Sequence, residues 1–241
     1  PTLFRSGKGL KMDTVTLNTA LHSLCQQRML NEARDLLKSA VKRGYIVDEV
    51  SYGTLIVGYF KDENVDTALK LWSGMKEKGI FPSIITYNSV IAGLCKTGKT
   101  EQAMGKLNEL LENGLVPDEI TYNTIIQGYC WEGNIEKAFL FHNKMVEKSF
   151  KPGIYTCNIL LRGLCRERRL SKAIKLFNTW ISKGKVLDAV TYNTLITALC
   201  KEGRLDEALG LVAEMQEKKL EPDSYTYNAI VGAFADVGRI N

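Results

Sequence analysis

Residues 85–91 read ITYNSVI, and residues 120–126 and 190–196 repeat this pattern as ITYNTII and VTYNTLI. Related strings recur every 35 residues along the chain, without an insertion. They begin at Val15, Val50, Ile85, Ile120, Tyr155, Val190 and Tyr225. A fixed period of this length is typical of proteins built from stacked structural repeats.

The chain divides into repeats that each start one residue before the shared string. Six complete repeats cover residues 14–48, 49–83, 84–118, 119–153, 154–188 and 189–223, and a partial seventh covers 224–241. Residues 1–13 align with the end of a preceding repeat whose first part is missing. We therefore expect this chain to be a piece of a longer array.

Each repeat carries the pattern of two helices. In the third repeat, apolar residues recur at helical spacing between Tyr87 and Leu94. Gly98 marks a turn, and a second helix is expected from Thr100 to Asn113. Because a single helix pair cannot bury its apolar face, the pairs must stack on one another. The sequence predicts an all-α, right-handed superhelical solenoid of 35-residue helix-turn-helix repeats with one concave face.

The overall composition excludes several classes of protein. Apolar residues make up 45 % and charged residues 24 % of the 241 residues, which is ordinary for a soluble globular chain. No stretch approaches the roughly 20 apolar residues that a membrane helix needs. The net charge of +5 permits an anionic partner without requiring one.

Five of the six cysteines occupy the twelfth position of their repeats, namely Cys25, Cys95, Cys130, Cys165 and Cys200. Packed helices lie about 10 Å apart, whereas a disulfide needs Cα atoms within about 7 Å of each other. No CxxC or HExxH motif occurs. We therefore expect small core side chains in a reducing compartment, with no disulfide, metal ion or other cofactor.

The second, fifth, ninth and thirteenth positions of each repeat share one flank of its first helix. The fifth position holds Asn18, Gly53, Asn88, Asn123, Asn158, Asn193 and Asn228. Asn is unfavourable inside a helix because its amide competes for backbone hydrogen bonds. These amides either link neighbouring repeats or cap a helix, or each one reads the edge of a nucleobase, as in helical arrays that read one base per repeat.

The last position of each repeat holds Asp48, Ser83, Asp118, Gly153, Asp188 and Asp223. An Asp just before a helix commonly caps it by accepting from exposed backbone N–H groups. The same carboxylate can also orient the amide at the fifth position. Both roles therefore remain open for these residues.

Two further positions on this flank suit a nucleic acid. The second position holds Val15, Val50, Ile85, Ile120, Tyr155, Val190 and Tyr225, which either pack against the previous repeat or stack on bases. Stacking on an aromatic ring is worth about 1–3 kcal/mol per base. The thirteenth position includes Lys61, Lys96, Arg166 and Lys201, which suit either the helix dipole or phosphates.

The repeat resembles the pentatricopeptide repeat in three features, most clearly in residues 85–118 and 190–223. TYN lies near its start, GLCK closes the first helix, and the unit ends in a KGxxPD-like string. The strict spacing is similar to the P-class of that family, whereas the tetratricopeptide repeat is one residue shorter. The resemblance implies sequence-selective binding of single-stranded RNA in a plant mitochondrion or chloroplast. It also implies a role in RNA processing, stability or translation.

In this family the fifth and last positions together choose the base, and Asn with Asp is associated with uracil. The resemblance implies uracil for the pairs Asn18–Asp48, Asn88–Asp118, Asn158–Asp188 and Asn193–Asp223. Gly53 with Ser83 leaves the base open, Asn123 with Gly153 implies a pyrimidine with weak discrimination, and Asn228 lacks its partner. The expected target, from its 5′ end, is U, any base, U, pyrimidine, U, U and a final pyrimidine.

Two rival functions remain open. The chain could be a scaffold that binds a protein on the same concave face, or part of an enzyme whose catalytic domain lies outside it. Because no catalytic motif occurs in the sequence, we expect no enzymatic activity, no membrane partner and no small-molecule substrate. Any protein partners would bind through regions outside this chain.

Overall fold

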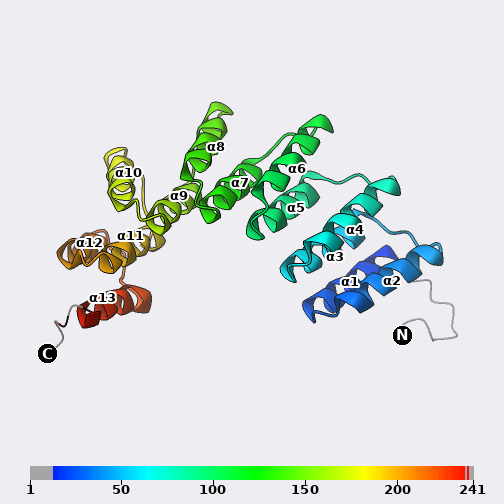
Figure 1. Cartoon of the computed structure of the whole chain (residues 1–241), viewed down its shortest axis with the longest axis horizontal. Helices are drawn as coiled ribbons and strands as arrows, with labels where there is room; N and C mark the ends of the chain where they lie inside the picture. Colours follow the sequence, from blue (N-terminus) through cyan, green and yellow to red (C-terminus); the bar gives the residue numbers. More distant parts are fainter. Residues whose placement is uncertain (1–12, 237, 239–241) are drawn as a thin grey trace. The chain divides into compact units, whose positions relative to one another are not determined.

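A computed structural model describes residues 13–236 and residue 238, and within them the chain forms thirteen α-helices and no strand (Figure 1). The helices are α1 (Thr14–Gln26), α2 (Leu30–Lys42), α3 (Glu49–Lys61), α4 (Val65–Glu77), α5 (Ile84–Lys96), α6 (Thr100–Glu112), α7 (Glu119–Trp131), α8 (Ile135–Glu147), α9 (Ile154–Arg166), α10 (Leu170–Ser182), α11 (Ala189–Lys201), α12 (Leu205–Glu217) and α13 (Ser224–Asp236). The chain is thus an all-α helical-repeat solenoid, as predicted. The expected preceding repeat, apart from Asp13, and residues 237 and 239–241 of the seventh repeat lie outside the described residues.

Every odd-numbered helix begins directly after the last residue of the preceding repeat, and Asp caps several of them. Asp13, Asp48 and Asp188 accept hydrogen bonds from the backbone N–H groups three residues later, those of Thr16, Ser51 and Thr191. The predicted capping role is therefore confirmed for these carboxylates. The second helix of the third repeat spans Thr100–Glu112, within one residue of its predicted end.

Each complete repeat contains two residues with positive φ angles, one after each helix. After the first helices they are Arg28, Glu63, Gly98, Gly133, Arg168 and Gly203, and after the second helices Gly44, Gly79, Gly114, Ser149, Gly184 and Lys219. This left-handed conformation ends a helix and is adopted by glycine without steric cost. The turn predicted at Gly98 is confirmed, since its φ is +69°.

Because Ser149 has a φ of +66°, we expect Ser149→Gly to raise the free energy of unfolding by up to about 1 kcal/mol. The matched control is Gly184→Ala, where φ is +70° and an added Cβ would meet nothing within 4 Å. That variant should lower the free energy of unfolding by a similar amount through the backbone alone. Urea unfolding of both variants tests this, and equal midpoints would contradict it.

Residues 1–118 form one compact unit, whose described helices are α1–α6. The first helices α1, α3 and α5 stack in order, and each packs against the second helix of its own repeat. The interior includes Leu21, Ile56 and Ile91, which are fully buried. Trp72 is also buried and meets the Tyr87 ring edge-on at 4.8 Å, so it packs in the core.

Residues 119–241 form the second unit, whose described helices are α7–α13. Here α7, α9, α11 and α13 stack in order, and α8, α10 and α12 each pack against the first helix of the same repeat. Phe177 of α10 meets Tyr192 of α11 edge-on at 5.2 Å. These contacts link successive repeats through buried aromatic rings.

Small residues let the helices of each unit approach closely. The alanines shared by the second helices, which are Ala33, Ala68, Ala103, Ala138, Ala173 and Ala208, are fully buried. A Cβ added at Gly93 would lie 2.3 Å from the ring of Phe60, and one at Gly163 would lie 2.6 Å from Cys130 Sγ. Only hydrogen fits between the helices at these glycines.

Candidate functional site

The fifth-position amides are hydrogen-bonded to the carboxylate at the end of their own repeat. Asn Nδ2 donates to an Asp oxygen in four repeats, where the shortest distances are 3.1 Å for Asn18–Asp48, 3.0 Å for Asn88–Asp118, 3.1 Å for Asn158–Asp188 and 3.4 Å for Asn193–Asp223. The two positions that sequence reasoning paired therefore meet in space.

The third position of each repeat supplies a partner that sequence reasoning missed. The hydroxyl of the following repeat donates to the amide oxygen: Ser51 to Asn18 at 2.6 Å, Thr156 to Asn123 at 2.8 Å, Thr191 to Asn158 at 2.7 Å and Thr226 to Asn193 at 2.6 Å. The sequence did contain a signal for this partner, because a hydroxyl side chain occupies the third position of every repeat. These residues are Thr16, Ser51, Thr86, Thr121, Thr156, Thr191 and Thr226. A hydroxyl on a helix face that is otherwise buried needs a polar partner.

These contacts fix the orientation of the amides. In Asn158, the oxygen faces the donating Thr191 hydroxyl and the nitrogen faces the Asp188 carboxylate. The side chain is only 8 % exposed. The amides therefore link neighbouring repeats through side-chain partners, which was one of the alternatives that the sequence left open. A flipped amide would place its oxygen against the carboxylate, which only accepts, so the carboxylate sets the orientation.

The carboxylates that hold these amides are stabilised in their charged form. Partial burial alone would raise the pKa of Asp188, but hydrogen bonds from Thr191 and Asn158 outweigh it and lower the pKa. Asp48 behaves in the same way, with Ser51 and Asn18 as its donors. At neutral pH these groups therefore act only as acceptors, which suits their contact with the amide nitrogen.

In repeat 2, the fifth and last positions are Gly53 and Ser83, so the repeat has neither the amide nor the last-position carboxylate. Glu49, at its first position, supplies a carboxylate instead. Glu49 Oε1 accepts from the backbone N–H of Ser83 at 2.7 Å, from the Ser83 hydroxyl at 2.5 Å and from the hydroxyl of Thr86. Burial alone would raise the pKa of Glu49, but these hydrogen bonds lower it. The Glu49 carboxylate thus accepts from the third-position hydroxyl of the next repeat. In other repeats the amide oxygen of Asn accepts from the corresponding hydroxyl.

In repeat 4, which has Asn123 and Gly153, the first position again supplies a carboxylate. Asn123 Nδ2 donates to Glu119 Oε1 at 3.5 Å, and its oxygen accepts from Thr156. A Cβ added at Gly153 would lie 4.0 Å from Glu119 Oε1. The Glu119 carboxylate therefore lies beside the place that an Asp side chain at position 153 would enter.

The second-position side chains are exposed in every repeat. Their exposed fractions range from 41 % at Val190 to 74 % at Ile85. Packing against the previous repeat therefore does not account for these apolar residues. Contiguous exposed apolar side chains commonly mark a binding surface.

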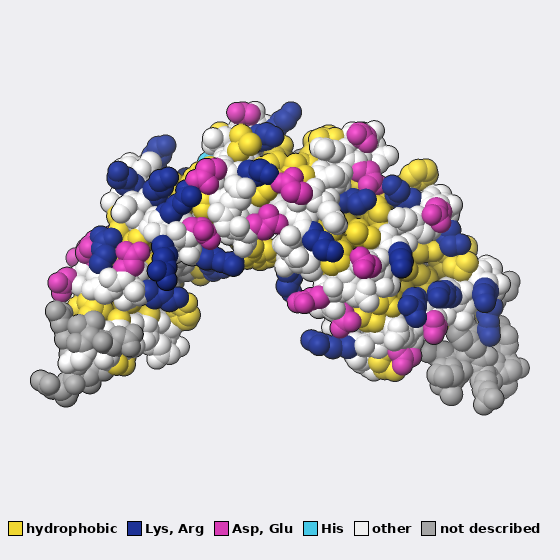
Figure 2. All heavy atoms as spheres, viewed as in Figure 1, with side chains coloured by type: hydrophobic (Ala, Val, Ile, Leu, Met, Phe, Trp, Pro, Cys, Tyr) yellow, Lys and Arg dark blue, Asp and Glu magenta, His cyan; other side chains and the backbone are white. Residues whose placement is uncertain are grey.

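The thirteenth-position cations lie near these apolar residues. Lys61, Lys96, Arg166 and Lys201 are exposed at the ends of α3, α5, α9 and α11. A hollow of about 540 Å³ in the second unit is lined by Arg166, Lys201, the ninth-position Arg162 and the second-position Tyr225. Figure 2 shows Lys and Arg side chains gathered over α9, α10 and α11. Positions that the sequence assigned to bases and to phosphates therefore share one surface.

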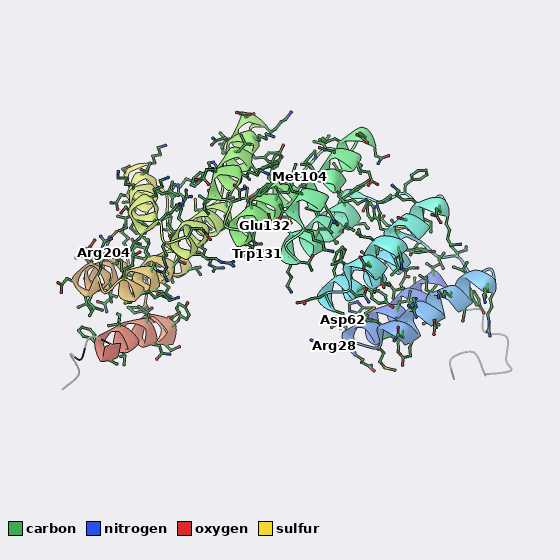
Figure 3. All side chains as sticks on the ribbon, viewed as in Figure 1. Arg28, Asp62, Met104, Trp131, Glu132 and Arg204 are labelled. Carbon is green, nitrogen blue, oxygen red and sulfur yellow. The ribbon has the colours of Figure 1, made fainter. Side chains whose placement is uncertain are left out.

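The first unit has a corresponding hollow of about 500 Å³. Second-position Val50 and Ile85, thirteenth-position Lys61 and Gly53 line it. Arg28 and Asp62, at the turns after α1 and α3, also border this hollow (Figure 3). The missing side chain at Gly53 thus leaves space where other repeats place an amide.

All six cysteines are free thiols, four of them buried. Within residues 13–236 and 238, no group of three or more His, Cys, Asp or Glu is placed to hold a metal ion. None of the described helices is long and apolar enough to cross a bilayer.

Fold and surface together define a helical-repeat solenoid with an exposed apolar or aromatic side chain at the second position of every repeat. Six repeats have Asn at the fifth position, and four have a cation at the thirteenth. Residues 12–58, 47–96, 82–128, 117–166 and 187–236 match the PPR repeat family, and residues 155–184 match a PPR repeat. The chain belongs to the pentatricopeptide repeat family. No curated protein sequence matches it.

Several solved structures share this fold. The pentatricopeptide repeat protein PPR10 from maize is 21 % identical with a TM-score of 0.69, over 96 % of this chain and 38 % of PPR10. The complex of PPR10 with an 18-nt psaJ RNA element gives the same identity and TM-score, over 96 % of this chain and 39 % of that one. Nuclear protein-only RNase P 2 of Arabidopsis thaliana is 18 % identical with a TM-score of 0.60, over 78 % of this chain and 42 % of that protein. This chain thus spans less than half the length of each of these proteins.

Proposed function

We propose that this chain binds single-stranded RNA selectively, one base per repeat, with a preference for uracil. The observation that carries the proposal is the fixed amide at the fifth position, with exposed apolar and cationic residues beside it. Membership of the pentatricopeptide repeat family and the RNA complex of PPR10 support RNA as the ligand. The chain would act by occupying RNA, without catalysis of its own.

The orientation of the amide gives a physical reason for uracil. An amide nitrogen carries two hydrogens, and in Asn158 the Asp188 carboxylate accepts one of them. The second hydrogen remains to donate to a base. Uracil presents its O4 acceptor to such a donor, whereas cytosine presents an amino group at the same place. An amide held in this orientation therefore favours uracil over cytosine.

The neighbouring positions complete the proposed binding of each nucleotide. The second-position side chains, from Val15 to Tyr225, would stack on successive bases, since every base has a π-face. Lys61, Lys96, Arg166 and Lys201 would contact phosphates. Four such contacts correspond to a log–log salt slope of about −3 for a single strand.

The assigned target runs from the 5′ end as U, any base, U, pyrimidine, U, U and a final pyrimidine. Asn18–Asp48, Asn88–Asp118, Asn158–Asp188 and Asn193–Asp223 would read the uracils, Gly53–Ser83 the unspecified base, Asn123–Gly153 the fourth base and Asn228 the last. Family membership supports a role in RNA processing, stability or translation in a plant mitochondrion or chloroplast.

A binding comparison tests this proposal. We expect a single-stranded RNA of the form UNUYUU to bind more tightly than a purine-rich RNA of equal length and than the same sequence as a duplex. Fluorescence anisotropy at fixed salt measures the three dissociation constants. Equal affinity for all three RNAs would contradict base reading, and no affinity for RNA together with capture of a peptide would favour the scaffold alternative.

A further inference from the structure

Repeats 2 and 4 lack a carboxylate at their last position, and both carry Glu at their first position. The last positions are Ser83 and Gly153, and the first positions are Glu49 and Glu119. The other repeats begin with Thr14, Ile84, Ile154, Ala189 and Ser224, none of which is acidic. Glu therefore occurs at the first position only where the last position has no Asp.

In the structure these glutamates reach the place of the missing carboxylate. Glu49 accepts from the Thr86 hydroxyl, as Asp188 does from the Thr191 hydroxyl. It also accepts from the backbone N–H of Ser83, the residue that precedes α5. Glu119 accepts from the amide nitrogen of Asn123, as Asp188 does from Asn158. A residue at the opposite end of the repeat sequence thus supplies the same chemical group.

We propose that Glu119 is a specificity-determining residue of repeat 4, which orients Asn123 so that this repeat selects uracil over cytosine. This inference rests on the proposed function. Asn123 is held on both sides as in the Asn–Asp repeats, with Thr156 on its oxygen and Glu119 on its nitrogen. Its amide therefore offers a hydrogen donor to the fourth base, and repeat 4 reads a specific base rather than any pyrimidine.

Repeat 2 provides the internal contrast. Glu49 supplies a carboxylate there, but Gly53 has no amide to orient. Repeat 2 accordingly has no fifth-position amide to donate to uracil O4. The second base of the target should therefore show no preference for uracil over cytosine, although the repeat contains the same first-position Glu.

The test measures the affinity of the full chain for the RNAs UAUUUU and UAUCUU. Wild type should bind the first about five- to tenfold more tightly, which is the effect of one hydrogen bond. Glu119→Ala should remove this difference, and Glu119→Ala combined with Gly153→Asp should restore it. Gly153 has φ −81° and ψ −175°, a backbone conformation open to Asp.

The matched control is Glu147→Ala, which removes an exposed carboxylate at the end of α8. It should leave the ratio of the two affinities unchanged. Equal binding of UAUUUU and UAUCUU by wild type, with uracil still preferred at bases three, five and six, would overturn the role of Glu119 and leave the proposed function standing. Loss of uracil preference at all of these bases would overturn both.

Discussion

Replacing Lys61, Lys96, Arg166 and Lys201 together by Gln is expected to lower the affinity for single-stranded RNA about 100-fold at 0.15 M salt. Each cation that contacts a phosphate releases a counterion, with a coefficient of about −0.7 per contact for a single strand. The log–log salt slope should therefore move from about −3 towards zero. Affinities measured between 0.05 and 0.3 M salt determine both quantities.

The matched control replaces four exposed lysines of the second helices and the residues that follow them, Lys38, Lys70, Lys148 and Lys183, by Gln. The change in net charge is the same in both variants. If the salt slope depends on net charge alone, the two variants will have equal slopes, and the assignment of the thirteenth position to phosphates is wrong. A slope that changes only in the first variant supports it.

Replacing Tyr155 and Tyr225 by Ala is expected to weaken RNA binding by about 5- to 150-fold for each residue. Both rings are exposed, at 58 % and 60 %, so their loss removes little from the core. A stacked base would lose its contact with the ring face. Dissociation constants for a uracil-rich RNA measure the effect.

Phe at these two positions is the matched control, because it keeps the ring and removes only the hydroxyl. Binding by the Phe variants should equal that of wild type within about threefold, since the proposed contact is stacking. Ala variants that bind as tightly as wild type would show that the second-position residues do not stack on bases. Thermal unfolding of each variant checks that the fold is retained.

The fold followed from the sequence because its signals were local and recurred in each repeat. Helical spacing, Gly98 and the Asp caps predicted where helices begin and end, and the second helix of the third repeat agreed within one residue. The unpaired cysteines were predictable for the same reason. In each case a given position of the repeat has similar surroundings in successive repeats.

The site was predicted only in part, because its contacts cross from one repeat to the next. The Asn–Asp pairs could be proposed from their shared flank, but the hydroxyls of Thr191 and Thr226 come from the following repeat. Glu49 and Glu119 were missed because they depart from the repeating pattern that the sequence reasoning followed. Their reach depends on side-chain length and direction, which a helical wheel does not contain.

The central claim is that the amide at the fifth position reads one base in its own repeat. The most direct measurement compares wild type with Asn158→Ala on UAUUUU and on the same RNA with cytosine at base one, three, five or six. Wild type should lose about five- to tenfold in affinity at each substitution, and Asn158→Ala should become indifferent at base five alone. An Asn158→Ala variant that binds all these RNAs more weakly by the same factor, and still prefers uracil at base five, would contradict the claim.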